Sequence, residues 1–94
     1  MAAVSVQQIE HAVREMLAND LRLGAETATR LSADTPLLGE GLGLDSIDAL
    51  NLVTAIEQRF GIEIGDDDLT VELFKSLNTL TGRVAQMISE RSGD

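Results

Sequence analysis

The stretch Gly41-Leu42-Gly43-Leu44-Asp45-Ser46-Ile47-Asp48-Ala49-Leu50 lies near the middle of the 94-residue chain and decides its fold. Asp45 is a favoured N-cap residue, and good helix formers follow it as far as Phe60-Gly61, where glycine suits the left-handed position after a helix. These signals predict a helix over about 46–60. At about 100° per residue, one stripe of this helix is apolar and is assigned to the core: Ala49, Leu52, Val53, Ile56 and Phe60.

Three further helices are predicted on either side of this one. Ser5-Val6-Gln7-Gln8 has the form of a capping box and begins a helix over about 6–21. Three consecutive aspartates favour the first turn of a short helix over about 66–73. Ser76 caps a last helix over about 77–91. The apolar stripes of the first and last helices are Val6, Ile9, Val13, Met16 and Leu17, and Leu77, Leu80, Val84, Met87 and Ile88.

The segment 23–45 lacks sustained periodicity and contains the only proline and four of the eight glycines, so it is predicted to be a loop. Apolar residues that could anchor it to the core are Leu31, Leu37, Leu38, Leu42 and Leu44. Aromatic residues make up only 2% of the chain, which leaves aliphatic side chains to build a helical core. We therefore expect one all-α domain over 1–94: a four-helix bundle of three long helices and a short third helix lying across them.

Composition excludes several classes of protein. The chain has no cysteine, and therefore no disulfide, thiolate zinc site or cysteine nucleophile. Neither a secretory signal nor a membrane span is recognised, so a cytoplasmic protein is expected. We also expect the protein to be freestanding and to act as a monomer. The net charge is −9. Between residues 40 and 72 the sequence contains nine acidic residues and a single basic one, Arg59. This acidic surface is either a solubilising face or one that steers basic partners, and it argues against nucleic acid as a partner.

Ser46 is the residue whose setting suggests chemistry. It places a hydroxyl at the first turn of a helix, after a glycine-rich loop, where free backbone N–H groups and the helix dipole favour a phosphate. A hydrolase serine would need a Gly-x-Ser-x-Gly frame and a histidine base, but the only histidine is His11 in the first helix. A calcium loop would need acids at alternating positions around a glycine, which Asp66-Asp67-Asp68 do not provide, so no metal site is predicted.

The segments Leu44-Asp45-Ser46-Ile47-Asp48 and Phe60-Gly61-Ile62-Glu63-Ile64 resemble the acyl carrier protein superfamily, whose attachment motif is Asp-Ser-Leu at the start of helix II. The likeness extends to Asp34 with Leu37 upstream and to the step Ser76-Leu77 before the last helix. The resemblance implies that the chain catalyses nothing itself.

In this family a transferase moves 4′-phosphopantetheine from coenzyme A onto the motif serine, here Ser46, and reads the preceding aspartate, here Asp45. The terminal thiol of the arm then holds an acyl group as a thioester. The implied partners are the phosphopantetheinyl transferase and the acyl-loading and condensing enzymes, of the ketosynthase and acyltransferase type, of fatty-acid or polyketide-type biosynthesis.

The resemblance also places partner recognition on the helix over 46–60, at Ile47, Asp48, Leu50, Asn51, Thr54 and Glu57. We expect Ile47 to be exposed and to insert into partner enzymes with basic patches, with Asp48 and Glu57 at its rim; the alternative is that Ile47 packs under the first loop. Asn51, Thr54 and Gln58 depart from the Glu, Met and Glu that are frequent in fatty-acid carriers.

Two other functions remain open from the sequence. One is a peptidyl or aminoacyl carrier of a nonribosomal peptide-type pathway, which would use the same serine and arm. The other is a helical adaptor without a prosthetic group, in which Ser46 would be an ordinary serine at a helix start.

Overall fold

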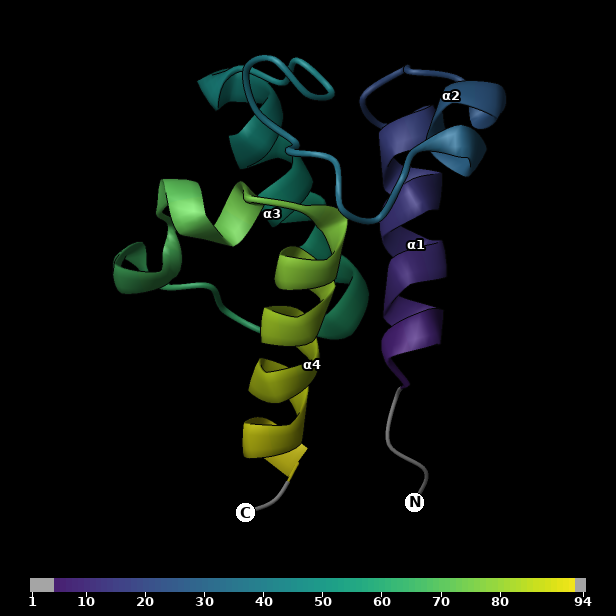
Figure 1. Cartoon of the computed structure of the whole chain (residues 1–94). Coiled ribbons are helices and arrows are strands. Elements are labelled where there is room, and N and C mark those ends of the chain that lie inside the picture. Colours follow the sequence, from purple (N-terminus) through teal and green to yellow (C-terminus); the bar gives the residue numbers. More distant parts are fainter. Residues whose placement is uncertain (1–4, 93–94) are drawn as a thin grey trace.

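Three long helices surround the core in the computed structural model, which describes residues 5–92: α1 (Val6–Asn19), α3 (Ser46–Phe60) and α4 (Leu77–Ser92). Along the chain, the short helix α2 (Ala25–Arg30) comes between α1 and α3. Two 3₁₀ segments, η1 (Asp66–Asp68) and η2 (Val71–Phe74), lie in the connection from α3 to α4. In Figure 1, α1 stands at the right, α4 at the lower left, and α3 passes behind α4. The described residues form no strand, so the predicted all-α bundle is confirmed.

The predicted apolar stripes supply much of the core, except for residues near helix ends. The connecting segments add further buried residues: Leu37, Leu44, Ile62, Ile64, Leu73 and Phe74. Val6, in the first turn of α1, is 47% exposed, and Phe60, Met87 and Ile88 are only half-buried. Each lies in the first or last turns of its helix, where fewer neighbours cover a side chain. Among the described residues, no helix is long and apolar enough to cross a membrane.

Helix α1 begins as predicted and ends two residues early. The Ser5 hydroxyl accepts a hydrogen bond from the Gln8 N–H at 3.1 Å, and the Gln8 side chain accepts one from the Ser5 N–H at 2.8 Å. The helix ends at Asn19 rather than at residue 21. The cause is Arg22, whose φ of 59° lies in the left-handed region and turns the chain away from the helix axis.

The segment 23–45, predicted to be a loop, contains the short helix α2. Within α2 only Ala28 is buried. A helix of six residues with one buried side chain produces no repeating apolar pattern, which is why periodicity does not reveal it. Such a short helix is marginal by itself and needs tertiary contacts.

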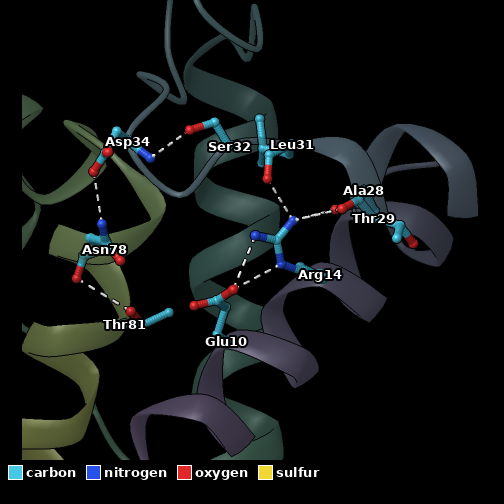
Figure 2. Close-up of polar contacts among 9 residues, drawn as sticks. All are labelled: Glu10, Arg14, Ala28, Thr29, Leu31, Ser32, Asp34, Asn78 and Thr81. Carbon is cyan, nitrogen blue, oxygen red and sulfur yellow. Dashed lines mark hydrogen bonds and ion pairs between the residues drawn. The ribbon is translucent and has the colours of Figure 1, made fainter.

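Arg14 of α1 supplies contacts to the end of α2 (Figure 2). Its Nη1 donates to the carbonyl oxygens of Ala28 at 2.6 Å and Leu31 at 2.8 Å. The carboxylate of Glu10 accepts from Arg14 Nε at 3.1 Å and from Nη2 at 3.0 Å, which fixes the orientation of the guanidinium. Since the last carbonyls of a helix have no partner within the helix, Arg14 replaces the missing donors.

Replacing Arg14 by alanine should lower the free energy of unfolding by about 1.5 to 3 kcal/mol, because carbonyls at the end of α2 lose a charged donor. Urea unfolding followed by circular dichroism measures the change. Arg30→Ala is the matched control: Arg30 pairs with Glu26 on the exposed side of α2, and its loss should cost less than about 0.5 kcal/mol. Equal effects of the two substitutions would show that Arg14 does not hold α2.

The predicted helix over 66–73 is wrong as a single element. It is divided into η1 and η2 by Leu69 and Thr70, and Thr70 is extended, with φ −122° and ψ 166°. Adjacent aspartates have low helix propensity and repel each other, and Thr70 is β-branched, so the segment cannot sustain two turns of α-helix. The break still lets Leu69 pack against the core, together with the buried Leu73 and Phe74.

Candidate functional site

The loop before Ser46 is closed by backbone hydrogen bonds. The Leu42 N–H donates to the Pro36 carbonyl at 2.8 Å, and the Leu44 N–H donates to the Leu37 carbonyl at 3.0 Å. The Leu37 N–H donates in turn to the carbonyl of Phe74, at the end of η2, at 3.1 Å. The loop is therefore attached to the connection between α3 and α4, and this attachment fixes the position of the residue that begins α3.

Asp45 is the N-cap of α3, as the sequence predicted. Its Oδ1 accepts from the Asp48 N–H at 2.8 Å, and Asp48 Oδ2 accepts from the Asp45 N–H at 3.4 Å. This reciprocal capping box satisfies one of the free N–H groups of the first turn and holds both carboxylates close to the backbone.

Ser46 is the first residue of α3, and its side chain is exposed. Within residues 5–92 its hydroxyl makes no hydrogen bond, because Asp45 performs the capping. The hydroxyl is therefore free to react. A phosphate on it would lie near the positive end of the helix dipole, an effect worth about 0.3 to 1 kcal/mol, with the charge of Asp45 opposing it.

An apolar cavity of ≈ 280 Å³ opens beside Ser46, between α3 and the segment 69–74. Its lining is largely aliphatic: Leu38, Ser46, Ala49, Leu50, Val53, Leu69, Thr70, Val71 and Phe74. The prosthetic group that the family resemblance implies needs an accessible hydroxyl and an apolar surface for its cargo. The residues around Ser46 provide both.

The predicted partner face has an exposed part and a part that is occupied within the protein. Ile47 is 69% exposed and Leu50 57% exposed, which excludes the alternative that Ile47 packs under the first loop. Asn51 and Thr54 are also exposed. Glu57 is half-buried, and its carboxylate accepts from the Ile64 N–H at 2.8 Å, so it holds the chain that follows α3.

Sequence reasoning did not identify Leu38, Leu69, Val71 and Phe74 as site residues. They lie on two segments away from α3 and join the cavity only through folding. No signal in the sequence separates Val71 from Leu69, Leu73 and Phe74 around it, although Val71 is 75% exposed and Leu73 and Phe74 are buried.

Comparison with known proteins agrees with this geometry. The model of a family described as the phosphopantetheine attachment site matches residues 11–84, a range that contains α2, α3, η1 and η2 completely. The matched range includes Ser46 and every residue that lines the cavity beside it. The fold and the site thus define a phosphopantetheine-bearing domain.

Similar proteins show which family of phosphopantetheine-bearing domains the chain belongs to. The acyl carrier protein of Phytoplasma mali is 32% identical over 82 residues, which are 87% of this chain and 86% of the relative. That of Onion yellows phytoplasma is 40% identical over 68 residues, 72% of this chain and 82% of the relative. That of Nitratidesulfovibrio vulgaris is 35% identical over 60 residues, 64% of this chain and 74% of the relative. The chain belongs to the acyl carrier protein family.

Proposed function

We propose that Ser46 carries the 4′-phosphopantetheine arm and that the chain presents acyl groups to enzymes of fatty-acid or polyketide-type biosynthesis. The observation that carries this proposal is the free, exposed hydroxyl of Ser46 at the start of α3, next to the apolar cavity. When attached, the arm supplies a terminal thiol that holds an acyl group as a thioester.

The protein's own residues position the arm and shelter its cargo. The capping box of Asp45 and Asp48 fixes the first turn of α3, so the direction in which Ser46 leaves the helix is set. Ala49 and Val53 form the α3 wall of the cavity, and Leu69 and Phe74 form the opposite wall. Burying an apolar chain between these walls is favourable by about 0.8 kcal/mol per methylene group.

Enzymes carry out the reactions in this proposal, and the chain supplies no catalytic group. A transferase acts on the Ser46 hydroxyl, and loading and condensing enzymes act on the thiol of the arm. The names of the relatives support acyl cargo rather than the amino acids of a peptidyl carrier.

The absence of cysteine provides a direct test of the arm. The purified protein, treated with phosphodiesterase to remove any arm already present, should have no reactive thiol. After incubation with coenzyme A and a broad-specificity phosphopantetheinyl transferase, and removal of free coenzyme A, titration with a thiol reagent should detect one thiol per chain.

The same titration separates the alternatives. An adaptor without a prosthetic group would gain no thiol with any transferase, and this result would contradict the proposal. A peptidyl carrier would also gain one thiol, so the loaded protein is then offered to an acyl-transferring enzyme and to an adenylation enzyme. Acyl loading is expected, and aminoacyl loading alone would contradict the assignment of cargo.

A further inference from the structure

One wall of the cavity beside Ser46 belongs to a segment that buries little of its own surface. Residues 69–71 line the cavity from the side opposite α3. None of the residues from 65 to 72 is buried, although Ile64 before them and Leu73 after them are. In Figure 1 this connection, drawn in green, lies at the left of the molecule. The wall therefore needs attachments other than buried side chains to keep its position.

One side-chain interaction attaches this segment to a helix within the described part of the chain. The Oδ1 atom of Asp68 accepts a hydrogen bond from Arg83 Nε at 3.1 Å, and Arg83 Nη2 lies 3.0 Å from the same oxygen. Arg83 belongs to α4, and the two side chains are only 32% and 30% exposed. Charged hydrogen bonds that are partly shielded from water are stronger and less screened than exposed ones. The Asp68–Arg83 pair thus holds the end of η1 against α4.

The backbone connects this pair directly to the wall of the cavity. Leu69 follows Asp68 with φ −82° and ψ 71°, and the Thr70 N–H donates to the Asp68 carbonyl at 2.9 Å. These values define an inverse γ-turn centred on Leu69, a compact turn without strain. A movement of Asp68 away from α4 therefore moves Leu69 and Thr70 with it.

The other end of the wall has stronger attachments. Leu73 and Phe74 are buried, and the Phe74 carbonyl accepts from the Leu37 N–H at 3.1 Å. Burial of two large apolar side chains contributes more to stability than one partly exposed ion pair. The wall can therefore open most easily at Asp68, while η2 stays in place.

We infer that Arg83 is a positioning residue for the acyl cargo: by holding Asp68 it keeps the segment 69–71 closed over the cavity, and loss of the pair opens the cavity to water. The inference rests on the proposed function, because the cargo is the acyl group on the arm of Ser46. Arg83 acts through Asp68 and the γ-turn, since it does not line the cavity itself.

Hydrogen exchange of the unmodified protein, followed by NMR, tests whether the pair holds the wall. Asp68→Ala removes the acceptor, and Asp67→Ala is its matched control because the Asp67 side chain is exposed and makes no ion pair within residues 5–92. The reporter is the Leu69 N–H, which donates to the Asp66 carbonyl at 3.2 Å. After correction for intrinsic rates, its exchange should be about fivefold faster in Asp68→Ala, which corresponds to about 1 kcal/mol, and within about twofold of the wild type in the control.

Arg83→Met removes the donor and keeps a long aliphatic side chain. It should accelerate exchange of the Leu69 N–H by the same factor as Asp68→Ala. The two substitutions combined should accelerate it no further, because either one breaks the same pair. The Leu80 N–H, which donates to the Ser76 carbonyl at 3.0 Å near the start of α4, should exchange at the wild-type rate in every variant, because the opening is local.

The reactivity of the thioester tests the effect on cargo. A broad-specificity transferase attaches an octanoyl or an acetyl phosphopantetheine arm to the wild type and to Arg83→Met, and hydroxylamine then cleaves the thioester. An octanoyl chain is long enough to enter the cavity of ≈ 280 Å³, whereas an acetyl group has only one methyl group to bury. Arg83→Met should raise the cleavage rate of the octanoyl thioester about threefold and leave that of the acetyl thioester unchanged.

Three results would contradict the inference. Equal exchange of the Leu69 N–H in Asp68→Ala and Asp67→Ala would show that the pair does not hold the wall. Octanoyl cleavage at the wild-type rate in Arg83→Met, or equal acceleration with octanoyl and acetyl, would show that the pair does not shelter the cargo. Failure of the wild type to accept any arm would instead remove the proposed function of Ser46, and the hydrogen exchange, which needs no arm, would still decide whether the pair holds the wall.

Discussion

Replacing Ser46 by alanine should abolish attachment of the phosphopantetheine arm and leave the free energy of unfolding within about 0.5 kcal/mol of the wild type. The hydroxyl is exposed and does not cap α3, which depends on the side chains of Asp45 and Asp48. Alanine is a strong helix former, so α3 should begin at the same residue. Thiol titration and urea unfolding measure the two effects.

Ser76→Ala should show the opposite behaviour. Ser76 directly precedes α4, and its hydroxyl accepts from the Thr79 N–H at 3.1 Å. Losing this cap should cost about 1 kcal/mol of stability and leave the attachment of the arm unchanged. If Ser46→Ala still accepted one arm, another hydroxyl would be the attachment site. If it unfolded the domain, the described role of Asp45 in starting α3 would be wrong.

The second large effect is expected at Gly41. A Cβ at this position would overlap the carbonyl oxygen of Pro36 and lie 2.7 Å from its carbonyl carbon. The same carbonyl accepts the hydrogen bond from Leu42 that closes the loop. Gly41→Ala must therefore displace the backbone before α3, and should destabilise the domain by about 2 to 3 kcal/mol.

Thermal unfolding measures this loss as a fall in Tm of roughly 10 to 20 °C. Gly82→Ala is the matched control, since a Cβ there meets nothing within 4 Å and the residue lies inside α4. The same chemical change should raise stability by up to about 1 kcal/mol at Gly82. A Gly41→Ala protein as stable as the wild type would show that the loop yields easily and does not position Ser46.

Capping residues and apolar periodicity within one short stretch of sequence predicted the bounds, the cap and the buried face of α3. The range 46–60, the cap at Asp45, the apolar stripe from Ala49 to Ile56 and the exposure of Ile47 all agree with the structure. Capping and amphipathic periodicity act over a few residues, so they can be recognised before the fold is known.

Features that depend on contacts between distant segments were missed. Helix α2 is held by Arg14, which lies fourteen residues before Ala28 in the chain. The sequence did not reveal that the Glu57 carboxylate accepts a hydrogen bond from the backbone N–H of Ile64. Val71 joins the cavity beside Ser46 only because η2 packs near α3. No local pattern in the sequence encodes these contacts.

The measurement that tests the central claim most directly is the mass of the intact protein after incubation with coenzyme A and a phosphopantetheinyl transferase, followed by fragmentation to locate the added group. Our account predicts the mass of one phosphopantetheine on every wild-type chain, located at Ser46, and no added mass on Ser46→Ala. An unchanged mass of the wild-type chain, or an arm on any residue other than Ser46, would contradict it.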